Sequence, residues 1–230
     1  MIAHRELAPR VHELTAPLRV APGFTLPARC TVLGLDDGTV AVVSPLLFDD
    51  DAARAIEALG AVSLIVAPNR YHHLFAGQAK ARWPAARLVG APGLAEKRRD
   101  LALEGVLGEA GALPQELEAI VIEGAASVGE VALAHHATRT LVVTDLVFHV
   151  LAPEGALTPW ILRAVGAHGK LAQGVEWRLF TRDRGAAAAS VARVLAFEAD
   201  RLLMGHGEPV VGDVRARLSA ALAWMRGPNG

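Results

Sequence analysis

The sequence predicts a mixed α/β fold in a single domain that spans residues 1–230. Short apolar runs of strand length recur along the chain, and segments with helical spacing separate them. Apolar residues make up 52% of the chain, which is enough for a protein of this length to bury a sizeable core. No low-complexity linker divides the sequence, so we expect one domain rather than two.

The first half of the chain begins with a predicted β-hairpin over residues 31–44. Its turn is Asp36-Asp37-Gly38, because Asp-Gly favours the left-handed backbone that tight hairpins need. Residues 52–59 follow three aspartates and precede Gly60, which is typical of a capped helix. The apolar run 62–67 lacks helical periodicity and predicts a strand buried on both faces. Helices are expected next at 74–83 and 94–103, and strands at 87–90 and 119–122.

The second half of the chain repeats this order of a hairpin followed by α/β segments. Residues 131–136 and 140–144 predict a second hairpin, which stops at Asp145. We interpret residues 153–180 as helix and loop that cover one face. The repeated order suggests two similar sheets stacked as a sandwich. A helix is expected at 185–197, a strand at 201–204 and a closing helix at 214–224.

Charge and hydropathy exclude several kinds of partner. The formal net charge is −1, so the chain has no strong field that would attract nucleic acid or an anionic membrane. Its uncharged runs, such as residues 58–69, are shorter than the roughly 20 residues that a membrane-spanning helix needs. We therefore expect a small-molecule ligand, with no nucleic-acid and no membrane partner. The sequence leaves the oligomeric state open.

The start of the chain and its cysteine content favour a cytoplasmic protein. Residues 1–13 carry charges where a secretory signal would need an apolar stretch. Cys30 is the only cysteine, which excludes an internal disulfide and any metal site built from several cysteines. It precedes an apolar run, so we expect a buried structural thiol.

Side chains of metal-binding types follow three of the predicted strands. His72 and His73 come shortly after the first strand, and Asp145 directly follows the second hairpin with apolar residues on both sides. A buried carboxylate of this kind needs a partner. Ligands in α/β proteins bind at the carboxyl ends of strands, so these side chains should share one cleft. The expected set is Asn69, His72, His73, Asp145 and His206.

This order of a histidine cluster, a later aspartate and a late Gly-His-Gly resembles the metallo-β-lactamase-like family over residues 31–209. The segment 144–148, Thr-Asp-Leu-Val-Phe, is similar to the Gly-Asp-x-x-Phe segment of that family. The segment 204–207, Met-Gly-His-Gly, is similar to its terminal histidine segment. The resemblance implies a four-layer αββα sandwich with a metal site between the two sheets, at their edge.

The chain departs from the family pattern at the first metal motif, which is usually His-x-His-x-Asp-His. If strand ends are aligned, Asn69 stands in place of the first histidine. If His73 is aligned with the last histidine, His72 replaces the aspartate, and Pro68 and Arg70 replace the first two histidines. The middle histidine position falls near Ala126, where there is no histidine. An uncharacterised subgroup with Pro-Asn-x-x-His-His and a terminal His-Gly-Glu shares this degenerate motif.

Three further histidines have open roles. His135 and His136 lie on the second hairpin, and we expect one to point inward and the other outward. His149 follows Asp145 by four residues and would flank the same cleft.

The resemblance implies a site for one metal ion rather than two. The metal ligands that it offers are His72, His73, Asp145 and His206, enough for one zinc or iron ion and too few for two. The first functional hypothesis is a mononuclear metal-dependent hydrolase in which metal-bound water attacks the substrate. Its catalytic proton acceptor would be Asp145 or Glu208.

Two other functions were weighed against this hydrolase. The alternative is a metal-free, catalytically inactive descendant of the fold that binds a small molecule or a protein partner. A Ser-His-Asp hydrolase is disfavoured, because neither Ser44 nor Ser63 lies in a Gly-x-Ser-x-Gly turn. No Gly-rich phosphate loop is present either.

Overall fold

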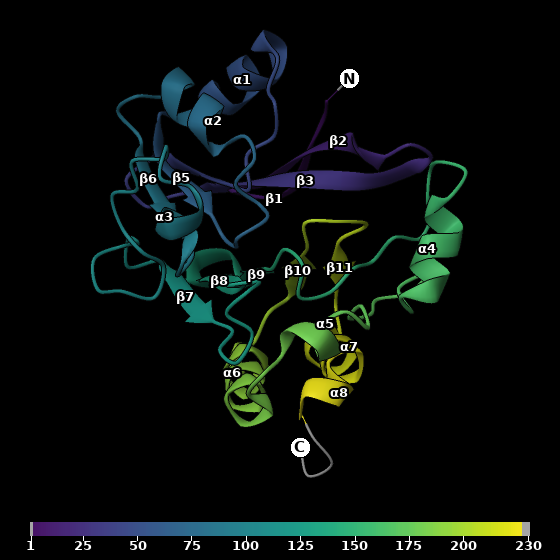
Figure 1. The fold of residues 1–230 in the computed structure, drawn as a ribbon. Helices are drawn as coiled ribbons and strands as arrows, with labels where there is room; N and C mark the ends of the chain where they lie inside the picture. The colour runs from purple at the N-terminus through teal and green to yellow at the C-terminus, as the bar shows by residue number, and fades with distance from the viewer. Residues whose placement is uncertain (1, 227–230) are drawn as a thin grey trace.

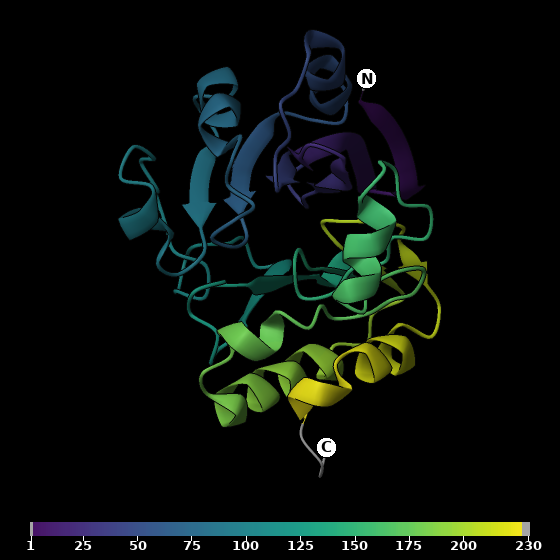
Figure 2. The same ribbon diagram turned by 45° about the vertical axis from the view of Figure 1, so that its right-hand side comes forward.

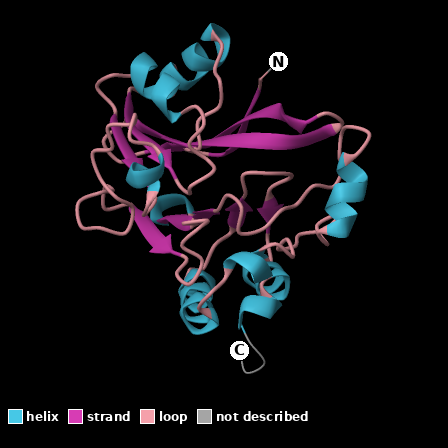
Figure 3. Cartoon of the chain, viewed as in Figure 1, coloured by secondary structure: helices cyan, strands magenta, loops and turns pink. Residues whose placement is uncertain are grey.

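A computed structural model describes residues 2–226 as two β-sheets packed face to face between outer layers of helices (Figures 1 and 3). The predicted α/β class and the four-layer αββα arrangement are both confirmed. Residues 1 and 227–230, at the ends of the predicted domain, lie outside the described part of the chain.

The first sheet has six strands in the order of the sequence, β1 to β6. Pairing is antiparallel from β1 to β4 and parallel from β4 to β6. The predicted hairpin at 31–44 is confirmed, as is the buried strand at 62–67. The strands are β1 (Ala3–Ala8), β2 (Val11–Ala21), β3 (Phe24–Gly34), β4 (Val40–Val43), β5 (Val62–Ala67) and β6 (Arg87–Gly90).

A long ribbon formed by β2 and β3 extends beyond the rest of this sheet (Figure 1). The strand β4 pairs only with Thr31–Gly34 of β3, so the earlier part of β3 has β2 as its ladder partner. The sequence analysis predicted neither β1 nor β2. Charged and polar residues interrupt the apolar ones on these partly exposed strands, which gives a weaker signal than a continuous apolar run.

The second sheet has five strands in the order β11-β10-β9-β8-β7. The neighbours β9 and β10 are parallel, and the other pairs are antiparallel. The predicted second hairpin is confirmed, with a short 3-10 turn between its strands. The strands are β7 (Leu117–Val121), β8 (Val131–His135), β9 (Thr140–Val142), β10 (Arg201–Leu203) and β11 (Val210–Val211).

Helices α1 (Asp50–Glu57) and α2 (Ala76–Arg82) cover the outer face of the first sheet. Helix α1 begins at Asp49, whose side chain accepts a hydrogen bond from the Ala52 amide, as a capping aspartate should. Helix α3 (Leu94–Lys97) is shorter than the predicted 94–103, because the backbone leaves helical geometry at Arg98, and Leu101 and Leu103 pack against the core.

The outer face of the second sheet is covered by helices from the last third of the chain (Figure 2). The longest of them has 13 residues, and no helix within 2–226 is long and apolar enough to cross a membrane. Segment 153–180 is helix and loop, as predicted. These helices are α5 (Trp177–Phe180), α6 (Arg184–Ala196), α7 (Val214–Ala221) and α8 (Ala223–Arg226). Helix α4 (Thr158–Ala164) lies apart from them and contacts β3 of the first sheet (Figure 1).

Three layers of buried apolar side chains hold the sandwich together. One lies between the first sheet and its helices, one between the two sheets, and one between the second sheet and its helices. Cys30 is fully buried in the first of these layers, and burial raises the pKa of its thiol. The expected structural thiol is therefore confirmed.

Candidate metal centre

Each sheet contributes a pair of adjacent parallel strands whose carboxyl ends meet at one edge of the sandwich. In the first sheet this pair is β4 and β5, which are followed by Ser44 and Asn69. In the second sheet it is β9 and β10, which are followed by Asp145 and His206. His72 lies three residues beyond Asn69. The structure thus brings together four of the five residues that the strand-end argument selected.

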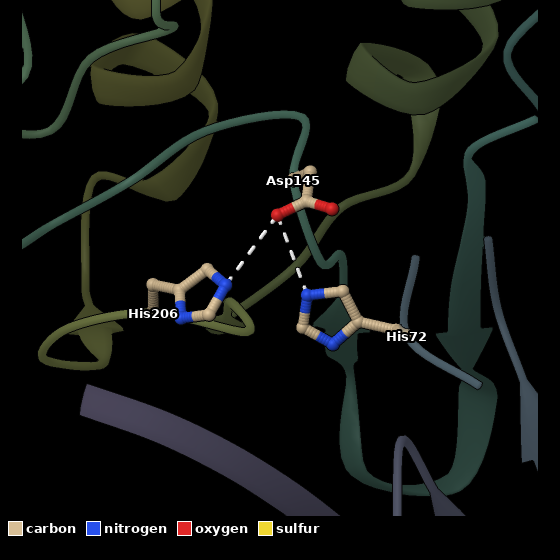
Figure 4. Close-up of side chains that lie close together, drawn as sticks. All are labelled: His72, Asp145 and His206. Atoms are coloured by element: carbon tan, nitrogen blue, oxygen red, sulfur yellow. Dashed lines mark hydrogen bonds and ion pairs between the residues drawn. The ribbon is translucent and has the colours of Figure 1, made fainter. Parts of the chain in front are cut away.

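His72, Asp145 and His206 form what we call the front cluster. The Nε2 atoms of the two histidines lie 3.3 and 3.5 Å from the same oxygen, Oδ1 of Asp145 (Figure 4). The three potential ligand atoms all lie within 4.8 Å of one another. Within residues 2–226, no second group of three histidine, cysteine or acidic side chains is arranged in this way.

The front cluster carries opposite charges that stabilise each other. Burial alone would raise the pKa of Asp145, but attraction to His72 and hydrogen bonds from His206 and His72 hold it well below its usual range. Burial likewise opposes protonation of His72, yet the Asp145 carboxylate raises the pKa of its imidazole above the ordinary value. An ionised Asp145 therefore faces the cleft at neutral pH.

The far ring nitrogens of both histidines are held by other hydrogen bonds. His206 Nδ1 lies 2.8 Å from the Pro27 carbonyl oxygen, which only accepts, so Nδ1 carries the hydrogen. His72 Nδ1 lies 2.7 Å from Ser44 Oγ, and Ser44 itself adopts a left-handed backbone with φ of 55°. Both rings are therefore fixed in orientation.

Behind the front cluster lies a fully buried polar group made of Asn69, Glu130 and Thr144, which we call the back cluster. The Asn69 amide donates to Glu130 Oε2 and Asp145 Oδ2, each at 2.8 Å. Glu130 also accepts hydrogen bonds from the Thr144 hydroxyl and from the backbone amides of residues 144–146. The back cluster therefore holds the loop that carries Asp145, as well as its carboxylate.

Two glycines and a buried ion pair position the loop of His206. A Cβ at Gly205 would lie 2.5 Å from His72 Cε1, so only glycine fits against that ring. Gly207 has φ of +96° and lies against the backbone of His149. Arg29 is buried, pairs with Glu13 at 2.7 Å and donates to the carbonyls of Met204 and Gly207. Contacts with His72 and His149 and the hydrogen bonds from Arg29 therefore hold the Gly-His-Gly segment in place.

A cavity of about 290 Å³ opens beside the front cluster. All three residues of the cluster line it, together with Ser44. Its other walls are apolar and come from the β2–β3 ribbon and from the loops after β4 and β5. Its remaining lining residues are Leu18, Val20, Leu26, Ala28, Pro45, Leu46, Tyr71, Leu74 and Phe75.

His73 does not join the front cluster, and here the sequence expectation is corrected. Arg98 donates to its Nδ1 at 2.8 Å, and His73 is not part of the group whose ligand atoms converge. Burial, followed by the charges of Lys97 and Arg98, lowers the pKa of His73. The reason is geometric, because consecutive residues in this turn point in different directions, and the backbone amide of His72, but not that of His73, is held by Asn69 Oδ1.

Other predicted side chains also lie outside the cavity. The Glu208 side chain is 59% exposed and its carboxylate lies 3.8 Å from Arg5, so the structure does not place it as a proton acceptor. His149 is buried, with Nδ1 bonded to the carbonyl of Glu208. His135 points inward and His136 outward, as expected.

Glu130 and Ser44 were not among the site residues predicted from the sequence. The available signal for Glu130 was an acidic residue directly before a fully apolar strand, the same pattern that singled out Asp145 at the end of a strand. Ser44 was judged only by its local sequence, whereas its relevance comes from His72, which lies 28 residues further along the chain.

The donor set of the front cluster fits a single metal ion. Two imidazoles and one carboxylate are a common ligand set for catalytic zinc and for non-haem iron, and three protein ligands leave positions open for water and substrate. The hydrogen bonds from Ser44, Pro27 and Asn69 would orient these ligands from behind, as metal sites require. The positions of the family's first two histidines and of its middle histidine contribute no further ligand.

Comparison with known proteins identifies the fold. No family model matches the sequence, and no curated protein matches it at a significant level. A metallo-β-lactamase from Pontibacter korlensis is similar in structure, with a TM-score of 0.64 at 12% identity, over 99% of this chain and 100% of that one. One from Erythrobacter litoralis, with β-mercaptoethanol in its active site, has a TM-score of 0.67 at 15% identity, over 97% and 96%.

A third similar structure is the metallo-β-lactamase FIM-1 from Pseudomonas aeruginosa in its mono-zinc form. Its TM-score is 0.65 at 13% identity, and the match covers 99% of this chain and 97% of that one. At such identities the likeness establishes architecture and leaves activity to be argued from the site. With its αββα layers and its strand-end cluster, the chain has the metallo-β-lactamase-like fold.

Proposed function

We propose that this protein is a metal-dependent hydrolase with one zinc or iron ion held by His72, Asp145 and His206. The observation that carries the proposal is the orientation of the front cluster. Both histidines direct Nε2 at one carboxylate oxygen, while separate hydrogen bonds hold their Nδ1 atoms. A purely structural ion pair would need only one such histidine.

The residues around the site would have separate roles in holding the ion, orienting its ligands and excluding water. His72, Asp145 and His206 would hold the ion, and Asn69 and Ser44 would keep two of these side chains in place. The ion, when bound, would supply a Lewis acid and lower the pKa of a coordinated water. The indole N–H of Trp177 donates to the Asp145 carbonyl at 2.7 Å and so fixes the backbone of the same loop. The apolar walls would exclude bulk water from the reacting bond.

Metal analysis of the purified protein tests the proposal. The full chain should be expressed without an affinity histidine tag, purified without chelator and analysed for metal content. We expect one ion per chain in the wild type and none in His206→Gln, with hydrolysis lost in parallel. His136→Gln is the matched control, because His136 is exposed and bonded to Glu118. A wild type that binds neither zinc nor iron when either is added would overturn the proposal.

One observation favours a second candidate, a metal-free serine hydrolase. Ser44 Oγ, the His72 ring and the Asp145 carboxylate are in line, at 2.7 and 3.3 Å, and Ser44 lines the cavity. This geometry resembles a nucleophile, a base and an orienting acid, although the local sequence lacks the usual turn. Ser44→Ala separates the two candidates, since it should abolish serine chemistry but only weaken a metal-dependent reaction.

The metal-free binding module remains the alternative to both enzymes. It is supported by the ion pairs that the front cluster makes within itself, because these neutralise the charges without any ligand. A protein of this kind would keep its metal-free state and its lack of hydrolysis in wild type, Ser44→Ala and His206→Gln alike.

A further inference from the structure

The β2–β3 ribbon turns one apolar face toward the front cluster. Leu18 on β2 is paired with Leu26 on β3, so their side chains lie on the same face. Val20 and Ala28 are two residues further along their strands and share that face. All four line the cavity, whereas Arg19 and Thr25, on the opposite face, do not.

The opposite wall of the cavity is apolar as well. Leu46 follows β4, and Leu74 and Phe75 lie between β5 and α2. At the mouth, Val20 is 53% and Leu74 55% exposed. Apolar side chains gathered around a concave site in this way favour a ligand that covers them.

No lysine or arginine of the described chain lines this cavity. Arg29 lies behind it, but its guanidinium is bonded to Glu13 and to two backbone carbonyls. Lys97 lies 4.6 Å from the ring centroid of Tyr71, and its Nζ donates to the Arg70 carbonyl. Away from the front cluster, an anionic group of a ligand would therefore meet apolar walls and no basic side chain to pair with.

A second hollow of about 340 Å³ continues the apolar surface. It shares the side chains of Leu18, Ala28, Leu46 and Phe75 with the first cavity. Beyond them it reaches Ile2 and Leu47, the latter 61% exposed. A ligand that begins at the front cluster could therefore continue along apolar side chains.

We propose that the substrate is an uncharged carboxylic ester with an unbranched apolar acyl chain. The choice of an ester rests on the proposed function, because the reacting bond is placed beside His72, Asp145 and His206. The size of the acyl chain comes from the cavity, which has about twice the roughly 150 Å³ that encloses a benzene molecule. The first cavity then takes on the order of ten non-hydrogen atoms. Substrates that carry a further anionic group are disfavoured, because no lysine or arginine of the described chain lines the cavity to pair with it.

Competition binding tests this substrate class without relying on catalysis. The neutral fluorophore N-phenyl-1-naphthylamine is bound to the full-length protein, both as purified and after chelator treatment, and is then displaced with methyl octanoate or with octanoate. The two competitors have the same acyl chain and differ in charge. We expect the ester to bind at least about tenfold more tightly than the carboxylate in the chelator-treated protein, since there the carboxylate must be desolvated without a metal ion or a basic side chain as a partner.

A chain-length series and two variants locate the binding site. Affinity should rise from methyl butanoate to methyl octanoate, by up to about fourfold for each methylene that becomes buried. Leu74→Lys should weaken binding of methyl octanoate and strengthen that of octanoate. Leu179→Lys is the matched control, because Leu179 is 80% exposed and lies outside both hollows, and it should change neither.

The outcomes separate this proposal from the proposed function. Octanoate binding as tightly as its methyl ester after chelator treatment would overturn the substrate class, as would a failure of the probe to bind. A preference for the ester in a protein that never binds metal would support the substrate class and reject the metal-dependent hydrolase. A protein that binds metal but prefers octanoate after chelator treatment would reject the substrate class and support the metal site of the proposed function.

Discussion

The front and back clusters are neighbouring groups of polar side chains whose environments differ. In the back cluster Asn69 and Glu130 are completely buried, and Glu130 alone accepts five hydrogen bonds from within the protein. In the front cluster the Asp145 side chain is 19% exposed and faces a cavity. Its histidines point ligand atoms at one oxygen and have few other partners on that side.

This difference shows which polar group supports the fold and which is available for chemistry. Buried polar atoms that are fully paired within the chain stabilise and position, because removing one partner leaves several groups unsatisfied. Ligand atoms that converge beside a cavity can exchange their mutual ion pairs for a metal ion or a substrate. Asn69 connects the two clusters, since one amide group touches both Glu130 and Asp145.

The largest loss of stability is expected from Glu130→Ala. It would leave three backbone amides, the Asn69 amide and the Thr144 hydroxyl without their buried acceptor. We expect the free energy of unfolding to fall by about 3 kcal/mol or more in urea denaturation. Glu118→Ala, at an exposed carboxylate paired with His136, should change it little. Equal effects of the two substitutions would contradict a structural role for the back cluster.

Asp145→Asn should act mainly on metal binding. The substitution keeps the shape of the side chain but removes the charge that draws His72 and His206 together. Because only the native state binds metal, the metal-loaded wild type should melt at a higher temperature than its chelator-treated form. At a metal concentration about one hundred times Kd, the expected gain in unfolding free energy is about 2.7 kcal/mol. The variant should melt alike with and without chelator.

The metal-free binding module gives a different result for the same substitution. Wild type and Asp145→Asn would both be insensitive to chelator, and they would differ by about 1–3 kcal/mol through a lost ion pair or hydrogen bond. Thermal melts of the two proteins, each with and without chelator, distinguish these outcomes. A wild-type melt that chelator leaves unchanged, in protein shown to be free of metal, counts against the hydrolase.

A smaller effect is expected from pH in the chelator-treated protein. Asp145 raises the pKa of His72 in the folded state, so the proton on His72 stabilises the fold below its ordinary pKa of 6.5. That stabilisation is lost as the pH rises from 6.5 through the raised pKa. The difference in unfolding free energy between wild type and His72→Gln should therefore shrink as the pH increases. A difference that grows with pH would show that His72 is neutral in the fold.

The smallest effect is expected from His73→Gln. Because His73 contacts Arg98 and lies outside the front cluster, its replacement should leave the metal content unchanged. His72→Gln, one residue earlier, should abolish metal binding. Metal analysis of the two variants in parallel tests this expectation. Loss of metal from both variants would show that His73 is also required for metal binding.

The site was predictable from sequence in its position but not in its full composition. Asp145 and His206 follow apolar runs typical of buried strands, and Asn69 and His72 follow another, so their meeting at one sheet edge could be expected. His73 was included for the same reason and does not belong. Glu130 was missed because it precedes its strand, whereas the predicted site residues were taken from positions that follow strands. Arg29 was missed because its partner Glu13 lies on β2, which was not predicted.

By itself the sequence determined most of the buried core strands and where they end. Apolar periodicity and turn residues act between neighbours along the chain, so the hairpin at Asp36-Asp37-Gly38 and the buried strand 62–67 are readable locally. Those strand ends also selected the edge at which the front cluster lies.

Only the tertiary structure decided which side chains face each other. Asn69 meets Glu130 across 61 residues, and His72 meets Asp145 across 73. In the turn after β5, the amide of His72 is held by Asn69, and its ring lies between Ser44 and Asp145, from the loops after β4 and β9. The direction of a side chain in a turn depends on partners of this kind, which local sequence does not specify. The choice of His72 over His73 therefore became fixed only when the two sheets packed together.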